Sequence, residues 1–89
     1  MIERDIEIVN RLGLHARAAA KLVQLVGSYK SDTRIAFRGR EINAKSIMGV
    51  MMLAAGFGST VSVRVDGPDE EPAMAAILDL FERRFDEGQ

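Results

Sequence analysis

The first residues of the chain alternate between apolar and charged side chains. In "IERDIEIVN" (residues 2–10), three isoleucines fall on one parity and three acidic residues on the other. Alternation with a period of two is typical of a strand that turns one face to the core and the other to water. The same pattern is clearer in "STVSVRVDG" (59–67), and "TRIAFRGREIN" (33–43) shows two shorter runs on either side of a tight turn at Gly39. The pattern therefore predicts four strands.

Three other stretches repeat apolar residues three and four positions apart, which predicts helices. The first spans residues 16–27, and the second lies in "SIMGVMMLAAG" (46–56), with Ser46 as its N-cap. The third follows Asp69, a candidate cap. The apolar stripe of the first helix comprises Ala16, Ala19, Ala20, Val23 and Val26, flanked by Leu22 and Leu25, and that of the third comprises Met74, Ile77, Leu78, Phe81 and Phe85.

These elements follow one another in the order β-α-β-β-α-β-α, without repeats or a linker. A four-stranded antiparallel sheet with three helices on one face would bury the apolar stripes. We therefore expect the α+β class, in the form of an open-faced sandwich. The 89 residues suit a single domain, residues 1–89. The tail "DEGQ" (86–89) is expected to fray.

The composition is that of a globular protein, with 47% hydrophobic and 28% charged residues. The longest mainly apolar stretch, residues 47–57, is interrupted by glycine and is too short to cross a bilayer, so no membrane insertion is expected. Charged residues begin at position 3 and the chain has no cysteine, which together favour the cytoplasm. A net charge of −1 lacks the basic excess of a nucleic-acid binder, so no nucleic-acid partner is expected.

The single histidine, His15, lies between a glycine-containing loop and the first predicted helix. If it caps that helix, the backbone N–H groups of Ala16, Arg17 and Ala18 lack partners inside the helix and form an anion site at the positive end of its dipole. The same positive potential disfavours the imidazolium, so the ring is expected to be neutral near pH 7. The Arg17 guanidinium suits phosphate oxygens, and Gly13 is expected to let the loop fold tightly against an incoming partner.

This arrangement suits a histidine that accepts a phosphoryl group and passes it on. The simpler alternative is a surface histidine without a chemical role, and the local pattern alone favours that alternative. The chain has neither a second histidine nor a cysteine to complete a metal site, so no metal is expected. No serine stands at a spacing that identifies a Ser-His-Asp nucleophile, and no cofactor is expected.

Two stretches, "GLHARAAAKLV" and "INAKSIMGVMMLAAGFGSTVSVRVDGPDEEPA", resemble the HPr family, the phosphocarriers of the bacterial phosphoenolpyruvate:sugar phosphotransferase system. The likeness covers nearly the whole chain, and the predicted order of elements agrees with that family's fold. It implies that His15 accepts a phosphoryl group on Nδ1 from enzyme I, itself charged by phosphoenolpyruvate, and passes it to a histidine of a IIA protein or domain. Arg17 matches the family's phosphate-site arginine. Ala18 stands where the family commonly has proline, and we expect the chemistry to be intact.

The resemblance also implies a monomeric carrier rather than an enzyme. Both the sugar-uptake branch and the nitrogen branch of the phosphotransferase system use such carriers. Ser46 has a structural role of its own, because a serine N-cap contributes about 1 kcal/mol. In many HPr proteins the matching serine is phosphorylated by an ATP-dependent enzyme, HPr kinase/phosphorylase, so regulation at Ser46 is a second hypothesis. The alternative function is a regulatory docking module that acts mainly through Ser46.

The second predicted helix carries more apolar residues than it can bury against one sheet. Val50 and Leu53 are expected to face the core. Methionines commonly fill gaps in a core, but the resemblance implies that those of this helix face outward and dock the partner proteins. The predicted docking residues are Ile47, Met48 and Met51 on this helix, with Ala20 and Gln24 on the first helix.

Overall fold

The computed structural model describes residues 1–87 and contains the regular elements in the predicted order, followed by a short 3₁₀ helix. The strands are β1 (Ile2–Glu7), β2 (Asp32–Phe37), β3 (Arg40–Asn43) and β4 (Thr60–Asp66), and the helices are α1 (Ala16–Gly27), α2 (Ile47–Met52), α3 (Glu70–Glu82) and the 3₁₀ helix η1 (Arg84–Asp86). Within residues 1–87, none of these helices is long and apolar enough to cross a membrane.

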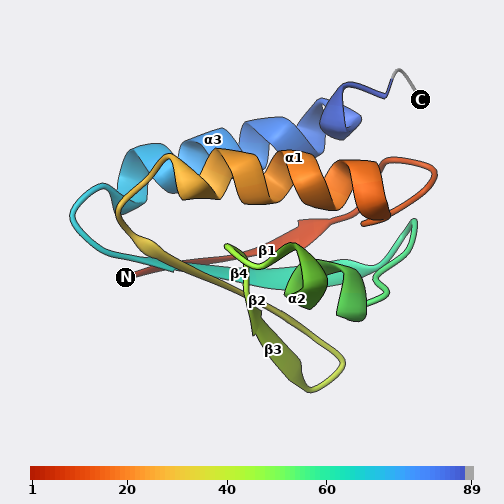
Figure 1. The fold of residues 1–89 in the computed structure, drawn as a ribbon, viewed down its shortest axis with the longest axis horizontal. Helices are drawn as coiled ribbons and strands as arrows, with labels where there is room; N and C mark the ends of the chain where they lie inside the picture. Colours follow the sequence, from red (N-terminus) through yellow and green to blue (C-terminus); the bar gives the residue numbers. More distant parts are fainter. Residues whose placement is uncertain (88–89) are drawn as a thin grey trace.

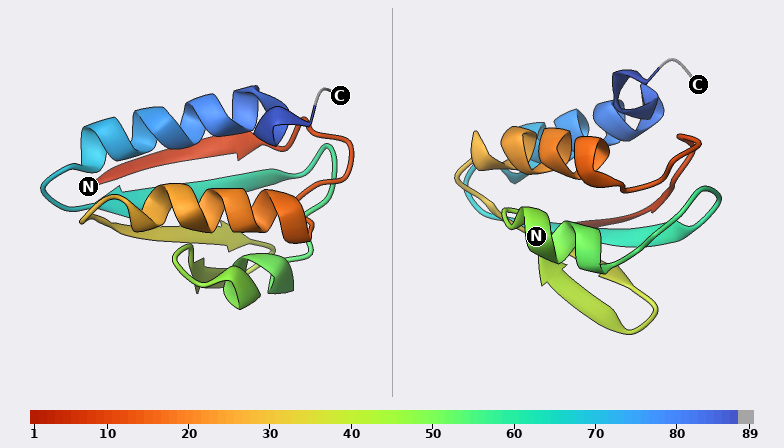
Figure 2. Two further views of the ribbon diagram at one scale, coloured as in Figure 1. Left: turned by 45° about the horizontal axis from the view of Figure 1, so that its top comes forward. Right: turned by 45° about the vertical axis from the view of Figure 1, so that its right-hand side comes forward.

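The four strands form one antiparallel sheet in the order β1-β4-β2-β3. The predicted alternation in β4 is confirmed, because Val61, Val63 and Val65 are buried while Ser62 and Arg64 are partly exposed. Helices α1 and α3 lie side by side across one face of the sheet (Figure 1), and α2 packs against α1 and β3 (Figure 2). The open-faced α+β sandwich expected from the sequence is therefore the observed fold.

The turn between β2 and β3 has the predicted tight geometry. Arg38 and Gly39 both have positive φ angles, 51° and 81°, and the two strands pair directly on either side of them. Two adjacent residues with positive φ are typical of the type I′ turns that connect antiparallel strands. The hairpin thus matches the right-handed twist of the sheet.

The face that α1 buries differs from the predicted stripe. Ala18 and Leu22 are completely buried, whereas Ala16 and Ala20 are exposed. Alanine offers little apolar area, so the orientation of the helix about its axis is set by its larger side chains, whose burial removes more apolar area from water. The prediction was wrong at Ala16 and Ala20, because the buried face of the helix is rotated by about a quarter turn from the predicted one. The buried residues of α1 are Ala18, Ala19, Leu22 and Val26.

Helix α2 is shorter than predicted. It ends at Met52, because Ala54 adopts a positive φ of 53° and turns the chain away from the helix axis. The carbonyl of Ala55 then accepts a hydrogen bond from the Leu14 amide at 3.0 Å. The helix therefore ends before Gly56, and the chain that follows it is fixed to the loop in front of α1.

The C-terminal part of α3 also departs from the prediction. The helix ends at Glu82, and Leu78 is 36% exposed rather than part of the buried stripe. Phe85 is fully buried, but it lies in η1 and has a positive φ of 54°. Its ring stacks edge-on against Phe81 with centroids 4.9 Å apart. Burial of Phe85 folds the chain back onto the end of α3.

The fraying expected for the tail is wrong for Asp86 and Glu87. Asp86 forms ion pairs with Arg83 and Lys21, and Glu87 contacts His15. Gly88 and Gln89 lie outside the described residues.

Asp69 occupies the N-cap position of α3 but does not cap it. Its carboxylate instead accepts hydrogen bonds from the amides of Lys30 and Ser31, at 2.8 and 2.9 Å, and from the Ser31 hydroxyl. The bond from the Ser31 side chain, followed by those from the two amides, lowers the pKa of Asp69 below its usual value. Asp69 thus joins the start of α3 to the connection between α1 and β2.

Candidate functional site

His15 is the N-cap of α1, with extended backbone angles (φ −75°, ψ −179°) and no side-chain capping hydrogen bond. The first bond of the helix runs from the Ala19 amide to the His15 carbonyl at 2.8 Å. Within residues 1–87, the amides of Ala16, Arg17 and Ala18 have no hydrogen-bond acceptor. Three free donors and the positive end of a 12-residue helix therefore lie beside the imidazole.

A shallow pocket of about 410 Å³ opens at this helix end. Its lining combines a cation, an anion, the imidazole and one apolar side chain from the preceding loop. The residues that line it are Leu12, His15, Ala16, Arg17 and Glu87. The site predicted from the sequence thus contains His15 and Arg17 together, with Glu87 as an addition that the sequence did not indicate.

Glu87 contacts the His15 ring and is itself held by Asn10. One carboxylate oxygen of Glu87 contacts His15 Nε2, and the other accepts a hydrogen bond from Asn10 Nδ2 at 3.1 Å. Asn10 Nδ2 also donates to the carbonyl of Gly13 at 2.8 Å. The Glu87 side chain is only 4% exposed, against 29% for that of His15. The imidazole is therefore held at Nε2 by a buried carboxylate, while the His15 side chain as a whole stays partly exposed.

The charge state of Glu87 follows from competing effects. Burial raises the pKa of its carboxyl group, but hydrogen bonds from His15 and Asn10 and the charges of His15 and Arg17 lower it. The net effect is a pKa below the ordinary value of 4.5, so Glu87 is ionised at neutral pH. A negative charge beside the ring was not predicted from the sequence, which indicated only the positive end of α1.

Gly13 has a structural role that the sequence did not indicate. It is buried, has a φ of +69°, and approaches the chain after α2 so closely that a Cβ atom would lie 2.7 Å from the Ala55 carbonyl oxygen and 2.8 Å from Gly56 Cα. An internal contact by itself therefore requires glycine at this position. The contact fixes the loop that carries His15 to the segment after α2.

Ser46 is the N-cap of α2, and its hydroxyl accepts a hydrogen bond from the Gly49 amide at 3.1 Å. The residue is exposed. Unlike the cap of α1, this cap satisfies one of the free amides of its own helix. Ser46 therefore has a structural function that is independent of any modification.

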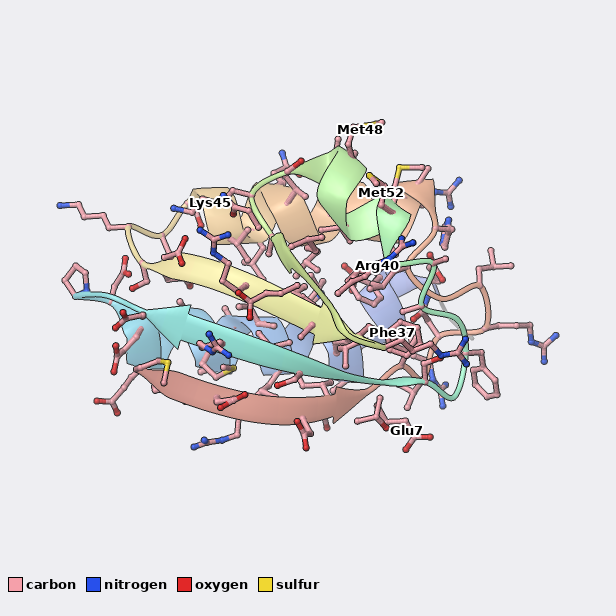
Figure 3. All side chains as sticks on the ribbon, turned by 90° about the horizontal axis from the view of Figure 1, so that it is seen from below. Glu7, Phe37, Arg40, Lys45, Met48 and Met52 are labelled. Atoms are coloured by element: carbon pink, nitrogen blue, oxygen red, sulfur yellow. The ribbon has the colours of Figure 1, made fainter. Side chains whose placement is uncertain are left out.

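Apolar side chains of α2 face outward as predicted. Val50 and Leu53 are buried, whereas Ile47, Met48 and Met51 are 40%, 67% and 41% exposed. Ala20 and Gln24 on α1 are also exposed. The exposed surface of α2 includes Met52 as well, which is 60% exposed and lies with Met48 on the outer side of the helix (Figure 3). Met52 was not among the predicted docking residues.

No cluster of three potential metal-ligating side chains occurs in the part of the chain that the structure describes. The side chains and backbone at the site offer an imidazole, a guanidinium, a carboxylate and free amides. These groups suit binding of an anion next to a nucleophilic ring nitrogen.

Comparison with known proteins identifies the class to which this arrangement belongs. Residues 2–83 match the family described as the PTS HPr component phosphorylation site. The chain is 58% identical to the phosphocarrier protein HPr of Cupriavidus necator over 89 residues, which cover 100% of both chains. It is 55% identical to HPr of Xylella fastidiosa over 87 residues, or 98% of each chain.

The fold gives the same result. The crystal structure of HPr-C-His from Thermoanaerobacter tengcongensis matches with a TM-score of 0.94 and 44% identity, covering 98% of each chain. The chain belongs to the HPr family of phosphocarriers of the phosphotransferase system.

Proposed function

We propose that this phosphocarrier accepts a phosphoryl group on Nδ1 of His15 from enzyme I, itself charged by phosphoenolpyruvate, and passes it to a histidine of a IIA protein or domain. The observation that carries the proposal is the position of His15 at the open N-terminus of α1, in one pocket with Arg17. Nε2 faces Glu87, so Nδ1 is the ring nitrogen left for the phosphoryl group. The amides of Ala16, Arg17 and Ala18 and the Arg17 guanidinium would hold its oxygens.

A carrier of this kind must bind a donor and an acceptor in turn on one surface. The exposed apolar residues of α2, namely Ile47, Met48 and Met51, supply a surface that can adapt to unlike partners, since methionine side chains are flexible. Ala20 and Gln24 extend it onto α1. The function proposed for the chain is that of a monomeric cytoplasmic carrier, which turns over phosphate only together with enzyme I and a IIA protein.

Phosphorylation of Ser46 is the regulatory part of the proposal. The residue is exposed and directly precedes the apolar residues Ile47 and Met48. A phosphate there would add charge to the edge of the docking surface and would replace the present capping bond with a stronger acceptor at the start of α2. A kinase of the HPr kinase/phosphorylase type is the partner this requires. A docking module that acts mainly through Ser46 remains the second candidate function, supported by the same exposed position.

Intact-protein mass spectrometry tests the relay directly. The wild type and His15→Ala are incubated with phosphoenolpyruvate and enzyme I, with Ser46→Ala as the matched control. We expect one acid-labile phosphoryl group on the wild type and on Ser46→Ala, and none on His15→Ala. Failure of the wild type to gain the group, under conditions that charge another HPr protein, would contradict the relay and favour the docking module.

A further inference from the structure

The imidazole of His15 is the end of a buried polar chain that starts at Asn10. Asn10 is fully buried, and its amide nitrogen donates both to the Gly13 carbonyl and to Glu87. The second oxygen of the Glu87 carboxylate contacts His15 Nε2. A carboxylate with a 4% exposed side chain is costly to bury unless such partners compensate it. The contacts with Asn10 and His15 therefore compensate a buried anion that lies against the ring.

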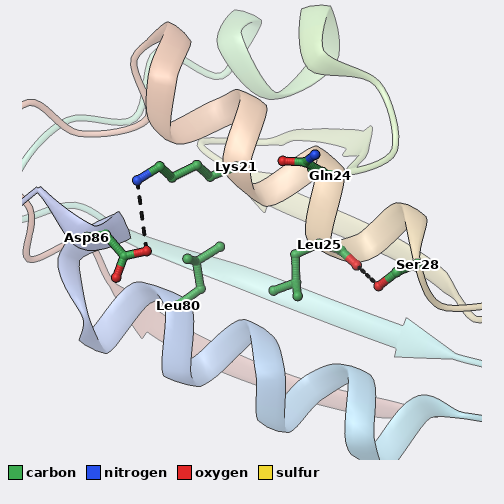
Figure 4. Close-up of a pocket in the computed structure, with 6 residues that line it drawn as sticks. All are labelled: Lys21, Gln24, Leu25, Ser28, Leu80 and Asp86. Carbon is green, nitrogen blue, oxygen red and sulfur yellow. Dashed lines mark hydrogen bonds and ion pairs between the residues drawn. The ribbon is translucent and has the colours of Figure 1, made fainter.

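The segment that carries Glu87 is fixed at several points. Phe85 is buried against Phe81, and Lys21 on α1 donates to the Phe85 carbonyl at 2.7 Å. Lys21 Nζ also lies 3.9 Å from an oxygen of Asp86, at the end of the groove between α1 and α3 (Figure 4). Residues 84–86 all have positive φ, and non-glycine residues keep such angles only where their surroundings impose them. These contacts hold Glu87 next to His15.

An ionised carboxylate can only accept hydrogen bonds, so the nitrogen that it contacts must carry a proton. The neutral imidazole has a single N–H group. With Glu87 at Nε2, that proton lies on Nε2 and the lone pair lies on Nδ1. The opposite tautomer would place the Nε2 lone pair against the carboxylate, which is repulsive, and would block Nδ1 with a proton.

We propose that Glu87, held by Asn10, is a positioning residue that keeps the proton of His15 on Nε2 throughout the phosphoryl-transfer cycle. This inference rests on the proposed function of His15. It adds to that function a residue from the C-terminal segment that acts through the ring and does not touch the phosphoryl group.

The transfer step balances without any movement of a proton. The Nδ1 lone pair forms the bond to phosphorus, while the bond from phosphorus to the donor atom of enzyme I breaks and its electron pair stays with that atom. The ring of His15 keeps its Nε2–H and gains a positive charge, which the Glu87 carboxylate compensates. In the second transfer the electron pair of the Nδ1–P bond returns to Nδ1, and the ring leaves as the neutral tautomer with which the cycle began.

The tautomer is tested first on the unphosphorylated protein, without any partner. In ¹⁵N NMR spectra of the His15 ring near neutral pH, we expect essentially only the Nε2–H form in the wild type. In Glu87→Ala the Nδ1–H form should become detectable, and Glu82→Gln, an exposed change on α3, should resemble the wild type. An unchanged tautomer ratio in Glu87→Ala would overturn the inference, whatever the function of the chain proves to be.

The second test measures how the phosphoryl group is distributed at equilibrium between enzyme I and this chain. Glu87→Gln keeps an oxygen acceptor of the same shape but removes the charge that compensates the phosphorylated ring. We expect roughly tenfold less phosphorylated carrier at equilibrium than in the wild type or Glu82→Gln, since a hydrogen bond to a charged group is stronger by about that factor. The apparent affinity for enzyme I should not change.

The two tests separate the possible failures. An equilibrium distribution for Glu87→Gln equal to that of Glu82→Gln would overturn the inference. A weaker apparent affinity for enzyme I with an unchanged distribution would also overturn it, because Glu87 would then serve docking. If the wild type is not charged at all, the proposed function fails, and the NMR result still decides whether Glu87 sets the tautomer.

Discussion

The N-termini of α1 and α2 have opposite designs. His15 caps α1 without a side-chain bond and leaves three amides open, whereas the hydroxyl of Ser46 accepts from the Gly49 amide and closes the start of α2. A serine cap contributes about 1 kcal/mol, and α1 does without that contribution. A helix start can serve either the stability of its own helix or the binding of an external anion, and under the proposed function this chain uses α2 for the first and α1 for the second.

The lengths of the two helices explain which of them can remain open. Helix α1 has 12 residues and buries four of them, including Leu22 and Val26. Helix α2 has six residues and buries only Val50 within its bounds. Short helices are marginal by themselves, so α2 depends more on its cap, while packing of α1 makes a capping bond dispensable.

The largest expected effect comes from Gly13→Ala, which disrupts the loop that leads to the open cap. A Cβ atom at Gly13 would collide with the Ala55 carbonyl and Gly56, and the left-handed φ adds strain. We expect a loss of about 2–4 kcal/mol in the free energy of unfolding, measured by urea denaturation. Gly39→Ala is the matched control, because its φ of +81° is also left-handed but nothing lies within 4 Å of the new Cβ. It should lose only about 1 kcal/mol, and equal losses for the two variants would contradict the close contact.

A smaller effect is expected from removal of the closed cap. Ser46→Ala should reduce the free energy of unfolding by about 1 kcal/mol, while charging of His15 by enzyme I stays unchanged. Ser46→Asp should keep the stability, because aspartate is an equally good cap, but should weaken binding to enzyme I by adding charge next to Ile47 and Met48. Thermal denaturation and calorimetric titration measure the two quantities. Equal binding by Ser46→Asp and the wild type would remove the support for regulation at this position.

The smallest expected effect is a difference in the pH dependence of stability. The pKa of Glu87 in the folded chain lies below its ordinary value of 4.5. Its contribution is therefore fully present above pH 4.5 and is lost as the pH falls through the folded pKa. Glu87→Gln should be less stable than the wild type at pH 7, and the gap should close in acid. Urea denaturation at a series of pH values checks this, and a gap that stays constant down to the lowest pH would show that the carboxylate charge does not stabilise the fold.

Much of the fold could be predicted from local patterns. The valines of β4, the three- and four-residue spacing of the helices and the tight turn at Gly39 each specify an element within a few neighbouring residues. The exact face of α1 could not be predicted in this way, because Ala16 and Ala20 have too little apolar area to fix the rotation. The end of α2 coincides with the positive φ of Ala54, and the next residue, Ala55, accepts a hydrogen bond from Leu14 in a distant loop, which no local pattern indicates.

The candidate site also contains residues that a local pattern indicates and residues that only a distant contact brings into place. His15 and Arg17 are close in the sequence, and the pattern "GLHAR" indicates both of them. Asn10 lies in a loop and Glu87 lies near the C-terminus. The residues that neighbour them in the sequence do not indicate that the two side chains form a hydrogen bond. One signal was available, since Phe85 is a large apolar residue close to the tail and its burial holds the following residues against the protein. Only the folded chain shows that this brings Glu87 to the ring.

The separation of His15 and Glu87 by 72 residues also has a consequence for the synthesis of the protein. At the usual rate of translation, about 4–14 s pass between the incorporation of the histidine and that of the glutamate. During this time the nascent chain already contains the imidazole and the arginine but lacks the group proposed to set the position of the ring proton. A product released by the ribosome before residue 87 would have the residues that mark a phosphocarrier, yet it should be charged less completely than the full chain.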